Sequence, residues 1–220
     1  MIIIFNFYLK FKSRLLIIMS LQAFLNKNHI EVGIDEAGRG PLIGRVYAAA
    51  VIWPQDLDNP EINDSKKISA KKRKILKEWI LENVTDYGVG YAEPEEIDYL
   101  NILQATYLAM HRALDNLKTK FDSILVDGNR FKPYHDKDYT TVIKGDATYY
   151  SISAASILAK EYHDEYIRDI CKKNPELDSK YKLLSNMGYG TKDHIKGIQE
   201  NGITQYHRKS FKTCQKKIEK

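Results

Sequence analysis

Residues 30–41, IEVGIDEAGRGP, decide the fold of this chain. The largely apolar run from Ile30 to Ile34 predicts a strand, and it leads into two adjacent carboxylates and a glycine-arginine-glycine turn. Carboxylates at the end of a buried strand are costly unless positive charge meets them. The stretch therefore predicts a sheet that carries an acidic site at one strand end.

Two further aspartates follow strand-like runs in the same way. Asp127 comes after Ile124-Leu-Val, and Asp146 comes shortly after Val142-Ile. Acid groups presented at three strand ends predict one convergent site, and its members are Asp35, Glu36, Asp127 and Asp146. Its natural occupant is a pair of hard divalent cations, because such ions take about six oxygen ligands each. Taken alone, Asp127-Gly128 favours a turn.

A site of this kind suits the hydrolysis of a phosphodiester. The reaction needs a deprotonated water, charge relief on the phosphorus oxygens and help for the leaving oxygen, and two metal ions about 3.5–4 Å apart supply all three. Successive side chains of a strand point to opposite faces, so Asp35 and Glu36 reach one site only if the strand ends or bends between them. Ala37-Gly38 permits such a bend.

The composition is that of a globular protein with a basic balance. The 220 residues, 43% of them hydrophobic, fit one domain with a full core and exclude a disordered chain. The formal net charge is +5, with basic excess over residues 66–77 and 207–220. A basic protein with a carboxylate cluster is typical of one that attracts a polyanion, although each lysine-rich run alone could be a solvated face.

The two cysteines, Cys171 and Cys214, have neither metal-like spacing nor a disulfide framework. This usage favours a reducing compartment, and we expect the protein in the cytoplasm.

The apolar start of the chain is too interrupted to predict a membrane span. Its charge-free stretches, residues 1–9 and 15–25, are shorter than the roughly 20 residues that a span needs. Positive charge follows the first apolar run, which argues against a signal peptide. We expect an N-terminal extension over residues 1–28, with Met19 as an alternative start, and no membrane partner.

The order of the expected elements predicts a mixed α/β fold. Strands are expected over residues 30–35, 46–53, 86–92, 123–127 and 140–144, and helices over residues 69–83, 94–117 and 148–172. Strands come first and mostly adjacent, so the sheet is mixed and not doubly wound. We expect residues 29–172 to form the core and residues 173–220 a small helical C-terminal region.

Several short fragments, taken in order, give the chain a specific resemblance to the ribonuclease HII family, the type 2 ribonucleases H. They are DEAGRGPL (35–42), DSKK (64–67), LVDG (125–128), KGDA (144–147), AASI (154–157), GYGT (188–191) and HRKSF (207–211). Each fragment is weak alone, whereas together they extend over about residues 30–212 and are highly specific.

The resemblance implies a ribonuclease H-like mixed sheet flanked by helices, with Mg²⁺ or Mn²⁺ held by the four carboxylates. It implies an endonuclease that hydrolyses the RNA strand of RNA–DNA hybrids. It also implies cleavage on the 5′ side of ribonucleotides embedded in duplex DNA, which leaves a 5′-phosphate and a 3′-hydroxyl. We expect the protein to act as a monomer on these nucleic acids.

Recognition of the ribonucleotide is expected at the Gly38-Arg39-Gly40 turn. Telling RNA from DNA means contacting a 2′-hydroxyl, and backbone groups approach a sugar closely where Cβ atoms are missing. Arg39 could meet the adjacent phosphate, whereas a bare Gly-Arg-Gly would favour a tight turn with a solvated arginine. Tyr189, between two glycines, resembles the family tyrosine that packs on the sugar at the RNA–DNA junction.

Two lysines are further candidates for substrate binding. Lys66 follows Asp64-Ser65 in a helix-start motif that could grip a phosphate. Lys160 shares one helical face with Ser156 and Asp164, which could look into the cleft, and it could also be an ordinary surface lysine. Of the six histidines, only His207 lies in a recognisable motif, and we expect it to pack near the C-terminus and not to act in catalysis.

The chain departs from the family pattern at two places. Asn186-Met187 stands where the family usually has His-Lys, which predicts weaker or redistributed phosphate binding. Arg45 stands where proline is common, and it could add a phosphate contact or be neutral.

Two other classes of protein remain open from the residues alone. A non-catalytic basic nucleic-acid-binding module would be favoured by a missing carboxylate, and none of the four is missing. Another metal-dependent phosphohydrolase would not need the Gly-Arg-Gly and Gly-Tyr-Gly-Thr elements together.

Overall fold

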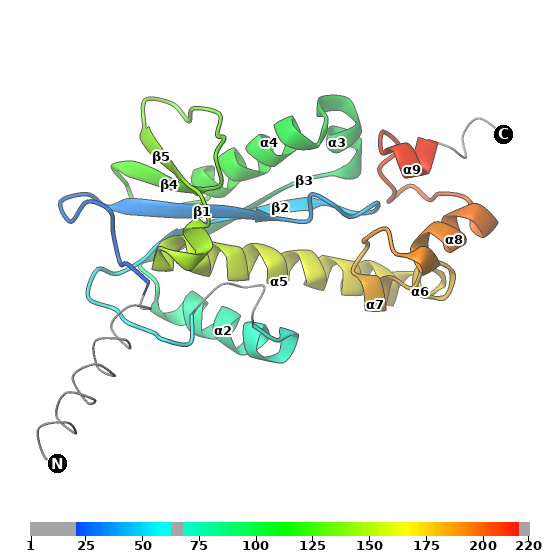
Figure 1. The fold of residues 1–220 in the computed structure, drawn as a ribbon, viewed down its shortest axis with the longest axis horizontal. Helices are drawn as coiled ribbons and strands as arrows, with labels where there is room; N and C mark the ends of the chain where they lie inside the picture. The colour runs from blue at the N-terminus through cyan, green and yellow to red at the C-terminus, as the bar shows by residue number, and fades with distance from the viewer. Residues whose placement is uncertain (1–20, 63–67, 216–220) are drawn as a thin grey trace, which may run out of the picture.

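One five-stranded mixed sheet forms the centre of the molecule (Figure 1). The structure is a computed structural model that describes residues 21–62 and 68–215. Its strand order is β3-β2-β1-β4-β5. The strands are β1 (Glu31–Ala37), β2 (Val46–Ile52), β3 (Asp86–Ala92), β4 (Ser123–Asp127) and β5 (Asp138–Val142). The prediction of a mixed α/β sheet with flanking helices is confirmed.

β1 is the strand at which antiparallel pairing gives way to parallel pairing, and this arrangement fixes where the acidic side chains meet. β1 pairs antiparallel with β2 and parallel with β4, and Ile34 lies opposite Val126 in the parallel register. β2 pairs antiparallel with β3, and β5 pairs parallel with β4. The ends of β1 and β4 that carry Asp35 and Asp127 therefore lie at the same edge of the sheet.

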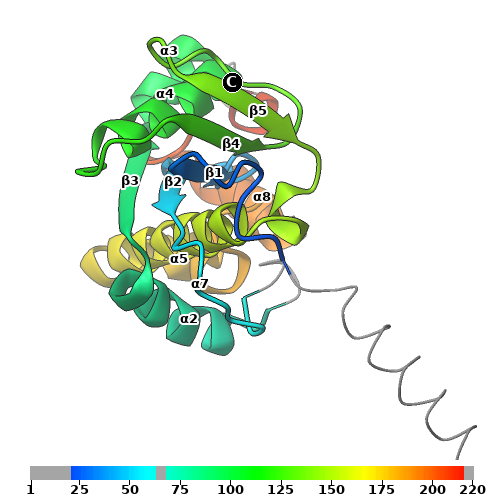
Figure 2. The same cartoon turned by 90° about the vertical axis from the view of Figure 1, so that its left-hand side faces the viewer.

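Helices cover both faces of the sheet (Figure 2). Helix α4 (Ile102–Asp115) packs on the face formed by apolar residues such as Val32 and Ile34, and α5 (Tyr150–Lys173) packs on the opposite face. Helix α2 (Ala70–Asn83) lies against the outer side of α5. Because of this layering, the strand ends that carry the acidic residues face α5.

The C-terminal region has its own apolar cluster. It contains α6 (Glu176–Tyr181), α7 (Leu183–Asn186), α8 (Lys192–Asn201) and α9 (Lys212–Gln215), which are orange to red in Figure 1. Leu42 and Ile43, from the loop between β1 and β2, are buried in the same cluster as Ile167 of α5 and Ile198 of α8. The β1–β2 loop therefore belongs, in its packing, to the C-terminal region.

Most element boundaries lie within two residues of the sequence prediction, and three differences bear on the fold. The helix expected over residues 94–117 is broken into α3 (Pro94–Leu100) and α4, because Asn101 adopts φ 71° and its side chain accepts the N–H groups of Leu103 and Gln104. β5 lies two residues earlier than expected. Asp146 lies in a short 3₁₀ turn, η2 (Gly145–Ala147), after Lys144 in a left-handed conformation.

Within the part of the chain that the structure describes, none of the helices combines the length and apolar character that crossing a bilayer requires.

Candidate active site

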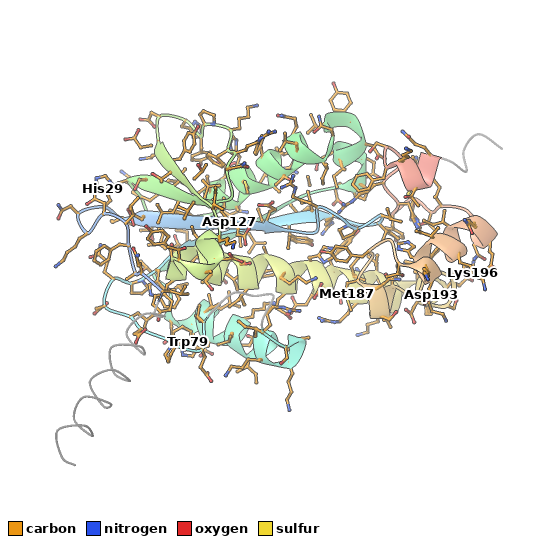
Figure 3. All side chains as sticks on the ribbon, in the orientation of Figure 1. His29, Trp79, Asp127, Met187, Asp193 and Lys196 are labelled. Carbon is orange, nitrogen blue, oxygen red and sulfur yellow. The ribbon has the colours of Figure 1, made fainter. Side chains whose placement is uncertain are left out.

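The parallel register of β1 and β4 places two acidic residues side by side. Asp35 follows Ile34 and Asp127 follows Val126, and these two predecessors are partners in the ladder. Residues at matching positions of neighbouring strands point to the same face. Both aspartates line a cleft of about 490 Å³ between the sheet edge and α5. Figure 3 labels Asp127 at this edge, above α5.

Glu36 lines the same cleft, although β1 does not end before it. β1 runs on to Ala37, paired with β2, while its pairing with β4 stops at Ile34. Beyond Ile34 the strand has only β2 as a paired neighbour, which opens the other side to the cleft. The Glu36 N–H donates to Asp35 Oδ1 at 2.7 Å, so the two neighbours are also coupled directly.

Asp146 lies next to this cleft and does not line it. Its side chain is buried, and the preceding Gly145 N–H donates to Asp127 Oδ1 at 2.7 Å. Over residues 21–62 and 68–215, three or more carboxylate, imidazole or thiolate groups are nowhere drawn together as a formed metal cluster. The structure thus brings three predicted acids to one cleft and the fourth to a turn that is hydrogen-bonded to the third.

The acids crowd negative charge into a partly buried space. Burial raises the pKa of the Asp35 carboxyl well above its ordinary value, and repulsion from Glu36 and Asp127 raises it further, against hydrogen bonds from Ser156 and the Glu36 backbone. Arg39 Nη1 pairs with Glu36 Oε1 at 2.9 Å, and its side chain is half exposed. The site therefore favours added positive charge, which oxygen-binding cations would supply.

Two cations on α2 and α5 line the same cleft as the acids, and both are paired with carboxylates of α5. Arg73 and Lys160 line the cleft together with Ser156. Arg73 donates to Glu161 Oε1 at 2.6 Å and to Asp164 Oδ2 at 3.0 Å, and Lys160 Nζ donates to Asp164 Oδ1 at 2.8 Å. Burial alone would raise the pKa of Asp164, but hydrogen bonds from His163 and Lys160 outweigh it and lower that pKa to about 2.

The predicted recognition residues lie at the mouth of the cleft. Gly38, Arg39, Gly40 and Tyr189 line it, and Gly38 adopts φ 86°, a conformation that side chains rarely allow. A Cβ on Gly40 would lie 3.2 Å from Tyr189 Cε1, so the missing side chain lets the ring sit against the turn. The Tyr189 ring is 40% exposed, with Lys160 Nζ 5.5 Å from its centroid.

The residues that depart from the family pattern make specific contacts within the protein. Asn186 Nδ2 donates to the Tyr181 carbonyl and its Oδ1 accepts the Gly188 N–H, so it shapes the loop that presents Tyr189. Met187, labelled in Figure 3 beside α7, adopts φ 48°. The Arg45 guanidinium binds Glu93 and lies between the rings of Tyr91 and Tyr166, 4.0 and 4.6 Å from their centroids. The structure favours the neutral alternative for Arg45.

Two arginines near the cleft were not singled out by the sequence. Arg73 belongs to a run of basic residues in α2, and the run does not reveal which member points inward. Arg208 is fully buried beneath the Gly38-Arg39-Gly40 turn. Lys66, which the sequence predicted as a phosphate contact, lies outside the described residues, so its role stays a prediction.

Comparison with known proteins gives a consistent result. The model of the family described as Ribonuclease HII matches residues 32–214. A ribonuclease HII of Parabacteroides distasonis is 50% identical over 191 residues, which are 87% of this chain and 94% of that protein. The ribonuclease H2 structure from Pyrococcus horikoshii OT3 has a TM-score of 0.68 at 26% identity and covers 84% of this chain and 95% of its own.

A more distant structure shares the fold. Bst-RNase HIII in complex with Mn²⁺ has a TM-score of 0.63 at 19% identity and covers 86% of this chain and 69% of its own.

Proposed function

The chain belongs to the ribonuclease HII family, and we propose that it cuts on the 5′ side of ribonucleotides embedded in duplex DNA, with two metal ions at the acidic cleft. As a member of this family it is a ribonuclease H, an endonuclease that acts on RNA–DNA hybrids. The observation that carries the proposal is the meeting of Asp35, Glu36 and Asp127 in one cleft that a glycine turn and an exposed tyrosine border.

The donor set fits divalent metal. Carboxylate oxygens are the ligands that Mg²⁺ and Mn²⁺ prefer, and the pKa of Asp35 is raised first by burial and then by the negative charge of Glu36 and Asp127, which a bound cation would offset. Asp35, Glu36, Asp127 and Asp146 would hold the ions. When bound, such ions supply an activated water and stabilise charge on the phosphate and on the leaving 3′-oxygen. The Mn²⁺ complex of Bst-RNase HIII, a protein of the same fold, supports this choice.

The residues of the chain would prepare the acids for this task. The Ser156 hydroxyl and the Glu36 N–H hold the Asp35 carboxylate, and the Gly145 N–H holds Asp127. The pair of Arg39 and Glu36 lies near the surface, with the arginine half exposed and the glutamate mostly covered, and near-surface pairs of this kind are worth about 1 kcal/mol or less. Arg39 could therefore leave Glu36 for a substrate phosphate at little cost, which would free the carboxylate for a metal ion.

Recognition would use the turn and the ring together. The backbone of Gly38 and Gly40 would approach the ribose, and Tyr189 would pack on the sugar from the other side of the cleft mouth. Lys160 would orient the ring and, with Lys66, would contact phosphates. We also propose residues 29–172 as the catalytic core and residues 173–220 as the region that contacts substrate, with residues 1–28 as an extension.

The test is cleavage of a DNA duplex that carries one ribonucleotide, with the cut position mapped at nucleotide resolution. We expect a single cut 5′ of the ribonucleotide with Mg²⁺ or Mn²⁺ and no cut after chelation. An all-DNA duplex and a continuous RNA–DNA hybrid serve as controls. Cleavage of the hybrid with none at the single ribonucleotide would contradict the proposed substrate, and metal-independent cleavage would contradict the proposed mechanism.

A further inference from the structure

Arg208 uses all five N–H groups of its guanidinium on one loop. Nε donates to the Gly44 carbonyl at 2.9 Å. Nη1 donates to the carbonyls of Arg39 and Pro41 at 3.0 and 2.8 Å, and Nη2 to those of Gly38 and Arg45 at 2.6 and 3.0 Å. The side chain is fully buried, so each donor would be costly without its acceptor. The shape of residues 38–45 is thus tied to one side chain.

The neighbouring residue, His207, reaches the other recognition loop through a second histidine. Its Nε2 lies 3.2 Å from His194 Nε2, and His194 Nδ1 lies 3.0 Å from the Tyr189 carbonyl oxygen. Both rings are fully buried, and each packs edge-on against the ring of Tyr181. A chain of two hydrogen bonds therefore runs from the turn that carries Arg208 to the backbone of Tyr189.

The groups at the two ends of this chain of hydrogen bonds decide which nitrogen of each histidine carries the proton. The Thr204 N–H donates to His207 Nδ1 at 3.0 Å, so that nitrogen carries no proton. The proton of neutral His207 is then on Nε2 and is donated to His194 Nε2. His194 in turn holds its proton on Nδ1 and donates it to the Tyr189 carbonyl, which can only accept. Burial lowers the pKa of His207 to about 3 and also lowers that of His194, so both rings are neutral near pH 7.

Main-chain hydrogen bonds also join the β1–β2 loop, the Tyr189 loop and the turn at residues 204–210. The Leu42 N–H donates to the Gly188 carbonyl at 2.8 Å, and the Arg208 N–H donates to the Leu42 carbonyl at 2.9 Å. Asp98 of α3 accepts the N–H groups of Lys209 and Ser210 at 3.0 and 2.8 Å, which anchors the turn to the rest of the fold. The β1–β2 loop, the Tyr189 loop and the turn at residues 204–210 thus form one unit.

We propose that His207 and Arg208 are positioning residues that set the spacing between the Gly38-Arg39-Gly40 turn and Tyr189, and with it the selection of an embedded ribonucleotide. This inference rests on the proposed function. A mispositioning of about 1 Å can cost as much as a hundredfold in rate, and the ring already touches the turn at Gly40. Asp35 and Glu36 lie on β1 and Asp127 on β4, where strand pairing holds them, so we expect their positions to depend less on this pair than the turn and Tyr189 do.

Two substitutions of His207 separate its two hydrogen bonds. His207→Asn keeps an acceptor near the Nδ1 position for Thr204 and removes the donor to His194. His207→Gln keeps an amide donor near the Nε2 position and gives up the Nδ1 acceptor. Lys196→Gln, on the exposed side of α8, is the matched control outside both loops. Thermal unfolding of all variants shows which of them are folded.

Steady-state cleavage of the duplex with one ribonucleotide is the main measurement. We expect His207→Asn to raise KM about tenfold and to change kcat by less than about threefold, since the acids stay in place. His207→Gln should remain within about threefold of the unchanged protein in both constants. A role in stability alone would instead lower kcat for both variants in proportion to the folded fraction, at unchanged KM, and that result would overturn the inference.

Nuclear magnetic resonance of ¹⁵N-histidine supplies a readout independent of cleavage. We expect the neutral His207 ring to carry its proton on Nε2 and the neutral His194 ring on Nδ1. The reverse tautomers would overturn the inference. If the unchanged protein makes no cut at the ribonucleotide, the proposed function fails and the inference with it. If that protein cuts and His207→Asn matches it in KM, only the inference fails.

Arg208→Lys gives a second, independent test. It keeps the charge but offers three donors in place of a planar fork of five. If the variant is folded at the assay temperature, we expect a larger rise in KM than for His207→Asn, because the loop at residues 38–45 loses its acceptor pattern. A folded Arg208→Lys protein with unchanged KM would overturn the role of Arg208.

Discussion

The acidic edge and the recognition side of the cleft are built in different ways. Asp35 and Asp127 are neighbours because two parallel strands pair in register, which is a regular and local device. The Gly38-Arg39-Gly40 turn and Tyr189 are neighbours because one buried turn binds both: Arg208 binds Gly38 across 170 residues of sequence, and His207 reaches the Tyr189 backbone through His194. The first arrangement needs the sheet alone, and the second needs the C-terminal region. We therefore expect substitutions at the acidic edge to impair the cleavage reaction and substitutions on the recognition side to impair the choice of substrate, each without the other.

The largest effect is expected at the acidic edge. Asp127→Asn keeps the Oδ1 that accepts the Gly145 N–H but removes the negative charge. Cleavage should fall about a thousandfold or more, while folding and hybrid binding remain close to those of the unchanged protein. Asp193→Asn, an exposed aspartate at the start of α8, is the control. Cleavage by Asp127→Asn at the unchanged rate would remove Asp127 from the mechanism.

The next effect separates the recognition side from the acids. Tyr189→Ala removes the ring that borders the turn and that would pack on the ribose. We expect about a tenfold or larger loss of kcat/KM at a single ribonucleotide and a smaller loss on a continuous hybrid. Tyr189→Phe tests the hydroxyl alone. Equal losses on both substrates would mean that the ring does not select the junction.

This contrast also explains what the sequence could predict. Acidic side chains after apolar runs are visible in the sequence, so the mixed sheet and the meeting of Asp35, Glu36 and Asp127 could be predicted, whereas the position of Asp146 in a short turn beside the cleft could not. The position of Tyr189 at the cleft could be predicted from its flanking glycines and the family resemblance, while its role stays a prediction. The role of Arg208 could not be predicted, because its partners are backbone carbonyls, which every residue has. The break at Asn101 was missed because the apolar spacing continues on both sides of it.

His207 should make the stability of the protein sensitive to acid. An unfolded histidine binds a proton near pH 6.5, whereas folded His207 does so only near pH 3. The unfolded state therefore binds more protons between these values, and the free energy of unfolding falls as the pH drops, by about 1.4 kcal/mol per pH unit for one such group.

Chemical denaturation between pH 7 and pH 4.5 measures this effect. His207→Gln removes one titrating group, so its stability should depend less steeply on pH than that of the unchanged protein. Parallel curves for the two proteins would show that His207 is not held neutral in the folded state.

The smallest effect is expected at Lys160, where the acidic edge and the recognition side of the cleft meet. Lys160 pairs with Asp164 and approaches the Tyr189 ring, a cation–π contact worth about 0.5–1 kcal/mol at a partly exposed site. Lys160→Gln should lower kcat/KM about threefold at low salt and less at high salt. Lys196→Gln serves as the control for the loss of one positive charge. A hundredfold loss would instead place Lys160 among the groups that act directly on the reacting phosphate.

The five bonds of Arg208 also bear on the order in which the protein matures. Residues 38–45 are among the first of the fold to be synthesised, yet the side chain that shapes them is made more than 160 residues later. Contacts of such sequence separation form late, because a long loop must close first. A nascent chain would thus complete its sheet and bring its acids together before it acquires the means to choose where to cut.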